Sequence, residues 1–426
     1  MGTAEGSGDA GASRGIGGTG GTGGTGGTGG TGVTAYPASW PGSGPWVASS
    51  RVLFVLLCLW AAVVVPLWWW LPLRTPPGWH AHEMVFAVGG GALAAYVPTA
   101  CNSWTGRAPV RGWPVAMLAA LYVTARGAAL LPPHALPRWL FALAFAAPLW
   151  WIAAVVLREL RSARKSLRAA VFPHSVLAFC ALAGGVSGWF GSGVMTGSPN
   201  PLLPQVVVGA FALLLAGVGG RMVPAFLNAA AERVGLPVVK QHRWSRLPFL
   251  TVLGLAVLTA GRPESAPLTL LAGLLVAAHV ARWPWRYARH DGMAAATLCV
   301  YLWIPIGLLG WGTARLATRW GPGLPLGPAA ASHLLTMGAL TGLVVAVMAR
   351  TSARRGDHRL HIRPTTLAGL VALMLAVPAR LAEVDGVAVG LWCLGWVLVA
   401  FGHRHHLVGP LQRPVFSARR HPVSDA

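Results

Sequence analysis

Charged side chains are scarce in this chain of 426 residues, because Lys, Arg, Asp and Glu together make up only 10% of it. A soluble domain carries roughly a quarter charged residues. Acidic residues are the fewest, with 11 against 33 Lys and Arg, and the net charge is +22. The basic residues lie in short clusters between apolar runs and do not converge on one stripe. We therefore expect a membrane protein with no nucleic-acid partner.

Cysteine and nucleotide-binding motifs are also poorly represented. The five cysteines are scattered through different apolar runs without a C-x-x-C pair, which argues against a thiolate metal site and against a disulfide framework: Cys58, Cys101, Cys180, Cys299 and Cys393. The sequence has no phosphate-binding P-loop and no polar segment long enough for a nucleotide-binding domain. These absences leave the apolar segments as the place to look for function.

Long apolar runs are what the sequence has in abundance, since 54% of its residues are hydrophobic. The run 52–73 contains no charged residue and is long enough to cross a hydrocarbon core of about 30 Å at about 1.5 Å per residue. We predict an all-α, polytopic transmembrane bundle of about twelve helices, from runs at 52–73, 82–102, 113–131, 138–157, 170–190, 202–220, 247–261, 266–281, 293–314, 329–349, 365–380 and 387–402.

The composition divides the chain into three parts. Residues 1–46 hold repeated Gly-Gly-Thr units with almost no large apolar side chain, so we predict a disordered low-complexity tail. Residues 47–410 form the predicted transmembrane helical domain, and residues 411–426 a cytoplasmic C-terminal tail.

The distribution of basic residues predicts the orientation of the bundle. Lys and Arg are concentrated in cytoplasmic loops of membrane proteins. With both termini cytoplasmic, only seven of the 33 basic residues fall on the outer side: Arg74, Arg126, Arg138, Arg262, Arg315, Arg319 and Arg380. We therefore predict that both termini are cytoplasmic.

A short Gly-Ala-Leu/Phe step recurs in the second, sixth and tenth spans, which share one orientation. It stands at 91–93, 209–211 and 338–340. Chance recurrence in a chain rich in Gly and Ala explains it, as does the use of small residues for close helix packing.

The densest polar cluster within the apolar part is Trp79-His80-Ala81-His82-Glu83-Met84, at the outer start of the second span. Ionisable groups at membrane depth are costly and tend to face the interior of a bundle. On a regular helix His80 and His82 point in different directions, so a shared metal needs His80 in the non-helical segment after Gly78. The alternative is an interfacial belt of Trp and His at the headgroups.

His333 lies at a similar predicted depth, near the outer start of the tenth span. Imidazole ligates both haem iron and copper, so His80, His82 and His333 are candidate ligands in one layer of the outer leaflet. Arg126 and Arg380, near the outer ends of spans three and eleven, are candidates to pair with haem propionates, although each also fits ordinary snorkelling to the headgroups.

Two further histidines, His174 and His279, lie near the inner ends of spans five and eight. They are candidates for a second ligand pair, or else satisfied core or interfacial histidines. The remaining histidines that we considered fall in loops or at the end of the last span, where solvated surface is the expectation: His134, His403, His405 and His406.

Four segments give the chain a resemblance to a known family. They are Trp79 to Phe86 with the sequence W-H-A-H-E-M-V-F followed by 102–107, the Gly-Gly-Arg-Met-Val-Pro stretch at 219–224, the Tyr-Leu-Trp-Ile-Pro-Ile-Gly stretch at 301–307, and the stretch from His333 to Arg350. In this order, across about residues 51 to 415, they resemble the NnrS family. The chain departs from the family at Leu298, where many relatives have a histidine, and after Arg350, where a Gly-His-Thr-Gly stretch is replaced.

The resemblance implies a twelve-helix protein of the cytoplasmic (inner) membrane that contains haem, of the b type, and copper, and that is linked to nitric oxide and nitrosative stress. It points to His80, His82 and His333, with Met84 beside them, as metal ligands. The expected partners are the lipid bilayer and nitric oxide or a related small ligand. The sequence leaves open whether the protein turns over a substrate. A haem-free secondary transporter of about twelve helices and a subunit that delivers haem or metal are the alternatives.

Overall fold

The structure is a computed structural model that describes residues 44–70, 76–168, 170–239, 242, 245–320, 326–356 and 359–408. The chain divides into two units, residues 1–38 and 39–426, and every described residue belongs to the second. The predicted N-terminal tail falls outside the described residues up to position 43, and the predicted C-terminal tail, 411–426, lies wholly outside them.

Nine helical segments of the described chain are long and apolar enough to cross a membrane. Six of them are single helices: α1 (Ser49–Trp70), α5 (Arg138–Ser162), α6 (Val171–Met195), α7 (Leu203–Glu232), α14 (Pro364–Leu381) and α15 (Asp385–His403). The other three are composite. One joins α2 (Trp79–His82), the π-helix η3 (Glu83–Gly89) and α3 (Gly90–Thr105), a second joins α10 (Gly292–Tyr301) and α11 (Trp303–Trp320), and a third joins α12 (Pro328–His333), the π-helix η5 (Leu334–Thr341) and α13 (Gly342–Ser352).

Three shorter helices complete the correspondence with the sequence. These are α4 (Trp113–Ala129), α8 (Leu247–Leu258) and α9 (Ser265–Ala281), which coincide with the remaining apolar runs. The all-α, polytopic fold class is therefore confirmed, and the chain is a multi-pass membrane protein. The sequence did not predict the small antiparallel hairpin of β1 (Arg354–Gly356) and β2 (Arg359–His361), which follows α13.

Local sequence sets where several of these helices begin and end. Proline stands in the first turn of α4, α7, α8, α12 and α14, where its missing N–H costs no intrahelical hydrogen bond. Gly106 closes α3 with a left-handed backbone (φ 72°), which a residue without a Cβ adopts at little cost.

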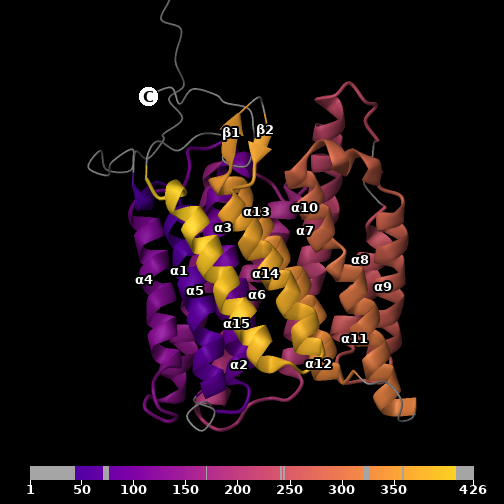
Figure 1. Ribbon diagram of the computed structural model, residues 1–426. Coiled ribbons are helices and arrows are strands. Elements are labelled where there is room, and N and C mark those ends of the chain that lie inside the picture. The colour runs from indigo at the N-terminus through magenta and orange to yellow at the C-terminus, as the bar shows by residue number, and fades with distance from the viewer. Residues whose placement is uncertain are drawn as a thin grey trace, which may run out of the picture. The chain divides into compact units, whose positions relative to one another are not determined.

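Segments far apart in the sequence pack side by side in the bundle. The first and last spans are neighbours, since the indole N–H of Trp392 on α15 donates to the Ala61 carbonyl of α1 at 2.7 Å. Helix α5 packs along α6, α14 along α15, and α9 along α11 (Figure 1). The π-helices η3 and η5 also touch, which brings the second and tenth spans together.

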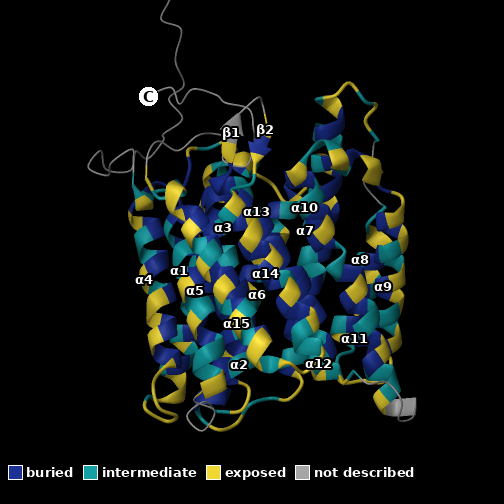
Figure 2. Ribbon diagram, viewed as in Figure 1, coloured by how far each residue is buried: buried dark blue, intermediate teal, exposed yellow. Residues whose placement is uncertain are grey.

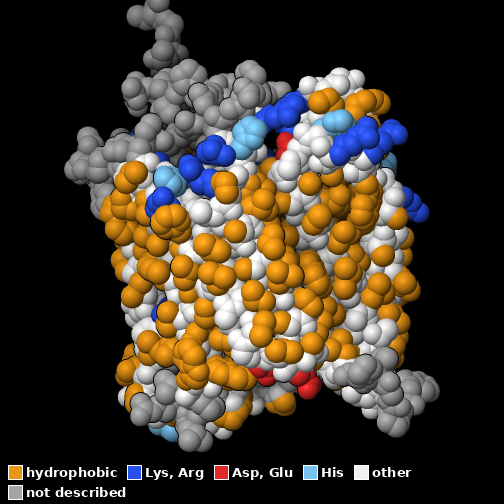
Figure 3. Space-filling model, viewed as in Figure 1, with side chains coloured by type: hydrophobic (Ala, Val, Ile, Leu, Met, Phe, Trp, Pro, Cys, Tyr) orange, Lys and Arg blue, Asp and Glu red, His pale blue; other side chains and the backbone are white. Residues whose placement is uncertain are grey.

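The surface of the helices is apolar, as expected for a bundle that faces lipid. Leu258, Leu182 and Trp70 are 83%, 72% and 71% exposed, and exposed residues follow the outward sides of the helices (Figure 2). Figure 3 shows a broad hydrophobic band, with Lys and Arg gathered at the end of the bundle that carries β1 and β2. This gathering agrees with the predicted orientation, in which that end is cytoplasmic.

Candidate functional site

A cavity of about 620 Å³ lies between the second and tenth spans at the predicted outer side, and we call it the outer cavity. Its walls come from the end of α1, from α2 and η3, from the start of α7, from α12 and η5, and from α14 and α15. In Figure 1, α2 and α12 lie at the end of the bundle opposite β1 and β2. The volume falls within the roughly 300–1,000 Å³ that is usual for ligand pockets.

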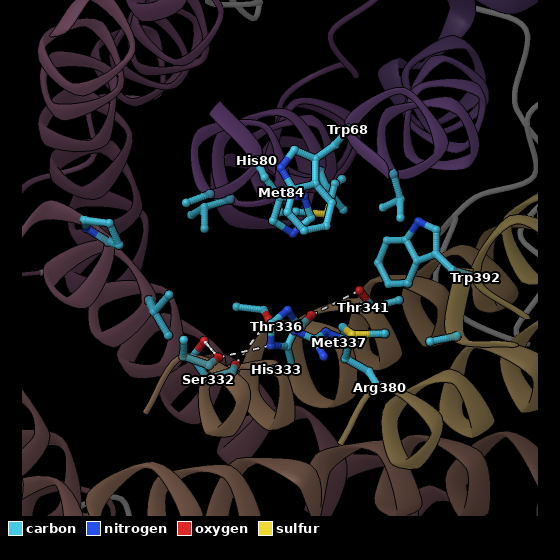
Figure 4. Close-up of a pocket in the computed structure, with 18 of the residues that line it drawn as sticks. Trp68, His80, Met84, Ser332, His333, Thr336, Met337, Thr341, Arg380 and Trp392 are labelled. Atoms are coloured by element: carbon cyan, nitrogen blue, oxygen red, sulfur yellow. Dashed lines mark hydrogen bonds between the residues drawn. The ribbon is translucent and has the colours of Figure 1, made fainter. Parts of the chain in front are cut away.

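His80 and His333 face each other across this cavity from the two spans (Figure 4). The Nδ1 atom of His333 lies 3.1 Å from the Ala329 carbonyl oxygen one turn earlier on α12. Because a carbonyl oxygen only accepts hydrogen bonds, Nδ1 carries the proton and Nε2 keeps its lone pair. Ligating histidines are commonly held in one tautomer in this way.

The ring of His80 is fixed by stacking instead. It lies against the indole of Trp68 on α1, with ring centroids 4.2 Å apart and planes inclined by 29°. Its Nδ1 atom is buried and has no hydrogen-bond partner among the described residues. An unpartnered buried nitrogen is costly, and a bound ligand at this position would satisfy it.

A methionine follows each of these histidines by four positions. Met84 on η3 and Met337 on η5 both line the outer cavity, so each span presents a His-x-x-x-Met pair (Figure 4). Residues four apart share a helix face, which explains why both members of each pair reach the cavity. Two imidazoles and two thioethers are ligands that suit iron and copper.

Arg380, on α14, supplies the positive charge of the outer cavity. Its guanidinium donates to Asp385 Oδ1 at 3.0 Å, and both side chains are about 30% exposed. Trp392 of α15 borders the same space (Figure 4). Asp385 accepts from one nitrogen of this guanidinium, and a guanidinium has further N–H donors that can bind a carboxylate of a ligand.

His82 lies away from the outer cavity, although the sequence grouped it with His80. Its Nδ1 is 2.8 Å from Glu83 Oε1, and its Nε2 is 3.3 Å from the hydroxyl of Ser187 on α6. Three phenylalanine rings surround it, those of Phe86, Phe145 and Phe190. The ligand role predicted for His82 stays a prediction, and its observed contacts are those of a buried structural side chain.

Arg126 is likewise directed elsewhere. On α4 it forms a buried ion pair with Glu83, and its guanidinium lies over the rings of Trp60 and Tyr122 at 5.7 and 5.5 Å. A contact with a propionate was predicted for Arg126 and for Arg380, and of the two only Arg380 lines the outer cavity.

His174 and His279, the second candidate pair, have separate surroundings. The Nδ1 of His174 lies 2.7 Å from the Ala170 carbonyl oxygen, one turn earlier in its own helix. His279 packs between the rings of Phe249 and Trp283, with centroids 5.2 and 5.6 Å away. These surroundings have no residue in common, and a metal shared by His174 and His279 stays a prediction.

Some residues of the outer cavity were not predicted from the sequence. Met337, Trp68 and Trp392 were missed, and for Met337 the repeated His-x-x-x-Met spacing was a usable signal. Within the described part of the chain, no group of three or more His, Cys, Asp and Glu side chains is placed to hold a metal ion. Any metal in the outer cavity would therefore depend on the imidazoles and thioethers.

One of three comparisons with known proteins found a match. A family model described as NnrS protein matches residues 46–410. Neither the curated proteins nor the solved structures gave a match to the chain. The matched range contains the outer cavity and the helices α1 to α15.

Proposed function

We propose, since this chain belongs to the NnrS protein family, that the outer cavity binds a b-type haem between His80 and His333 and receives nitric oxide there. Membership of the family links this membrane protein to the response to nitric oxide. The haem, its ligands, copper and a place in the cytoplasmic (inner) membrane are our proposals. Whether nitric oxide is only bound or is also converted is left open by this proposal.

One observation carries the proposal: two imidazoles from distant spans face each other across a cavity of suitable size. His333 offers the Nε2 lone pair, because its Nδ1 proton is held by the Ala329 carbonyl. His80 brings an unpartnered buried nitrogen, and Trp68 holds its ring in place. When bound, haem would supply an iron centre that binds nitric oxide directly.

The remaining walls fit a large, flat, mostly apolar group. Trp68, Trp311 and Trp392 provide aromatic surface, and Arg380 provides a cation for a propionate. Apolar surroundings keep water away from the site, which governs both ligand access and redox potential.

Copper is the second group that we propose for this site. Thioether sulfur is a soft ligand that favours Cu(I), and Met84 and Met337 lie beside the two imidazoles. If the imidazoles held the haem iron, the thioethers of Met84 and Met337 would remain as ligands for a neighbouring copper. The iron and copper content per chain distinguishes joint occupancy from alternative occupancy.

The test is an absorption spectrum with metal analysis on protein purified from a haem-replete host. We expect a Soret band, iron in stoichiometric amount, and a shift of that band when nitric oxide is added anaerobically. Absence of the band and of stoichiometric iron would refute the proposal. Uptake of a solute into reconstituted vesicles by haem-free protein would instead favour a secondary transporter.

A further inference from the structure

Two smaller cavities continue from the outer cavity toward the predicted cytoplasmic side. The middle cavity, of about 10 Å³, shares Val85, Val208 and Thr336 with the outer cavity. The inner cavity, of about 90 Å³, shares Phe211, Leu215 and Leu340 with the middle cavity. Shared walls of this kind show that the three spaces form one row.

The row follows three spans in the same direction. On α7 the walls advance from Gln205 in the outer cavity, through Ala212 in the middle cavity, to Met222 in the inner cavity. On η3 and α3, and on η5 and α13, the inner cavity likewise lies further along than the outer one, and the middle cavity lies beside the deepest part of the outer cavity, which reaches Val88 and Thr341. From Gln205 to Met222 a helix rises about 25 Å, which is most of the thickness of a hydrocarbon core.

The recurring Gly-Ala-Leu/Phe step of the sequence lies beside the inner cavity of this row. Its third residue in each span, Leu93, Phe211 and Leu340, lines the inner cavity. Three spans thus contribute equivalent apolar side chains to one space. The step marks the seam along which the second, sixth and tenth spans meet.

Phe211 stands at the narrow point, because it borders both the middle and the inner cavity. Its ring meets the ring of Phe179 edge to face, with centroids 5.4 Å apart. Opposite it is Gly89, where an added Cβ would lie only 2.7 Å from Phe211 Cε1. Because Gly89 has no Cβ, there is room for the ring of Phe211.

The volume and the polarity of these cavities limit which molecules can pass through them. The middle cavity has room for about one water-sized sphere, which excludes an acyl chain or a quinone ring. A water molecule needs two to four polar partners. The one hydroxyl of that cavity, on Thr336, already donates to the Ser332 carbonyl at 3.1 Å. A small, uncharged, apolar molecule is what remains.

We propose that the three cavities form a route along which a small uncharged gas molecule of the nitric oxide class moves between the inner half of the bundle and the outer cavity, with Phe211 at its constriction. Such a molecule concentrates in the hydrocarbon of the bilayer, so a route inside the bundle receives it where it is abundant. This inference rests on the proposed function for the identity of the gas, whereas the route itself rests on the cavities.

Xenon tests the route without haem, because it binds dry apolar cavities in proteins. In xenon-pressurised crystals of haem-free protein we expect density in the inner cavity, because the middle cavity, with room for about one water-sized sphere, is too narrow to hold a xenon atom at rest. Ala212→Leu places a larger side chain in the middle cavity but not in the inner one, so xenon should remain in the inner cavity of this variant. Ala210→Leu, on the same helix but outside the three cavities, is the control and should also keep xenon in the inner cavity. An inner cavity without xenon in the unaltered protein would overturn the route.

Ligand kinetics supply the second readout, on haem-loaded protein. After photolysis of bound carbon monoxide, Ala212→Leu should slow rebinding from solution by about tenfold or more, and Ala210→Leu should leave the rate within about twofold. Phe211→Ala should accelerate rebinding. If Ala212→Leu does not fold, Ala212→Val is the smaller filling. Equal rates in a folded filling variant and the control would show that the gas enters elsewhere. A chain without haem would refute the proposed function, and the xenon experiment alone would then decide the route.

Discussion

Glu83 is a charged side chain inside the bundle. It is fully buried and is held between Arg126 and His82. Taking charges out of water is expensive, and a buried ion pair repays this cost only while both partners are present. The neighbouring residues on either side, His82 and Met84, therefore have their positions set partly by this pair.

Removing one partner of the Glu83–Arg126 ion pair should lower the free energy of unfolding more than removing both. We predict that Arg126→Met lowers the free energy of unfolding by about 3–5 kcal/mol, because Glu83 is left as an unpaired buried charge. The double variant Glu83→Gln/Arg126→Met should lose less than the sum of the two single changes. Thermal unfolding of the purified proteins in one detergent measures all four species of the cycle, and simple additivity would contradict a coupled buried pair.

At the same scale, the sequence predicted part of the candidate site. His80, His333 and Arg380 were chosen from residue type and predicted depth, Met84 was added through the family resemblance, and all four line the outer cavity. The sequence could not predict that His82 lies away from the outer cavity. Its position depends on hydrogen bonds with Glu83 and with Ser187 of α6, which is far along the chain.

Among the elements, α5 and α6 show how glycine permits close packing. A Cβ on Gly188 would lie 2.6 Å from the backbone oxygen of Ala142 on α5, whereas one on Gly185 would meet nothing within 4 Å. Both glycines lie within α6, so the two positions differ mainly in what surrounds them.

This contrast gives a matched pair of substitutions. Gly188→Ala should destabilise the protein by about 1–3 kcal/mol, because a backbone atom cannot move aside as a flexible side chain can. Gly185→Ala should be neutral or stabilise it by up to about 1 kcal/mol, since alanine is the better helix former. Thermal unfolding compares the two, and equal effects would show that α5 and α6 pack less closely than described.

The sequence did not predict the two π-helices. They begin directly after His82 and His333, and π-helical turns often occur at functional sites. Apolar periodicity could not reveal them, because η3 and η5 consist almost entirely of apolar and small residues and so show no polar face to count from. The hairpin of β1 and β2 was missed because its short strands carry arginines and lie in a loop.

For the whole molecule, the positions of the apolar helices followed from the sequence, whereas only nine helical segments of the described chain, and not about twelve, are long enough to cross a membrane, and which of them are neighbours did not follow from the sequence. Length and apolarity determine whether a segment can cross a membrane. Contact between the second and tenth spans arises from the packing of the entire bundle, which no local pattern encodes. The outer cavity exists only through that contact.

The predicted orientation belongs to this scale and can be tested directly. In a variant without the five native cysteines, Ala135→Cys should react with a membrane-impermeant maleimide added to intact right-side-out cells without an outer membrane. Val234→Cys should react only after permeabilisation, because it lies in a predicted cytoplasmic loop. Both positions are exposed, so accessibility within the protein is matched. The reverse labelling pattern would show that the bundle has the opposite orientation and that the outer cavity lies on the cytoplasmic side.

The central claim is that His80 and His333 together hold haem. Its most direct test is the haem and iron content of His80→Ala and His333→Ala, purified beside the unaltered protein and His134→Ala, an exposed loop histidine that serves as the control. We predict that haem per folded chain falls by about tenfold or more in both cavity variants and is unchanged in the control. Full haem content in folded His80→Ala and His333→Ala would contradict the account.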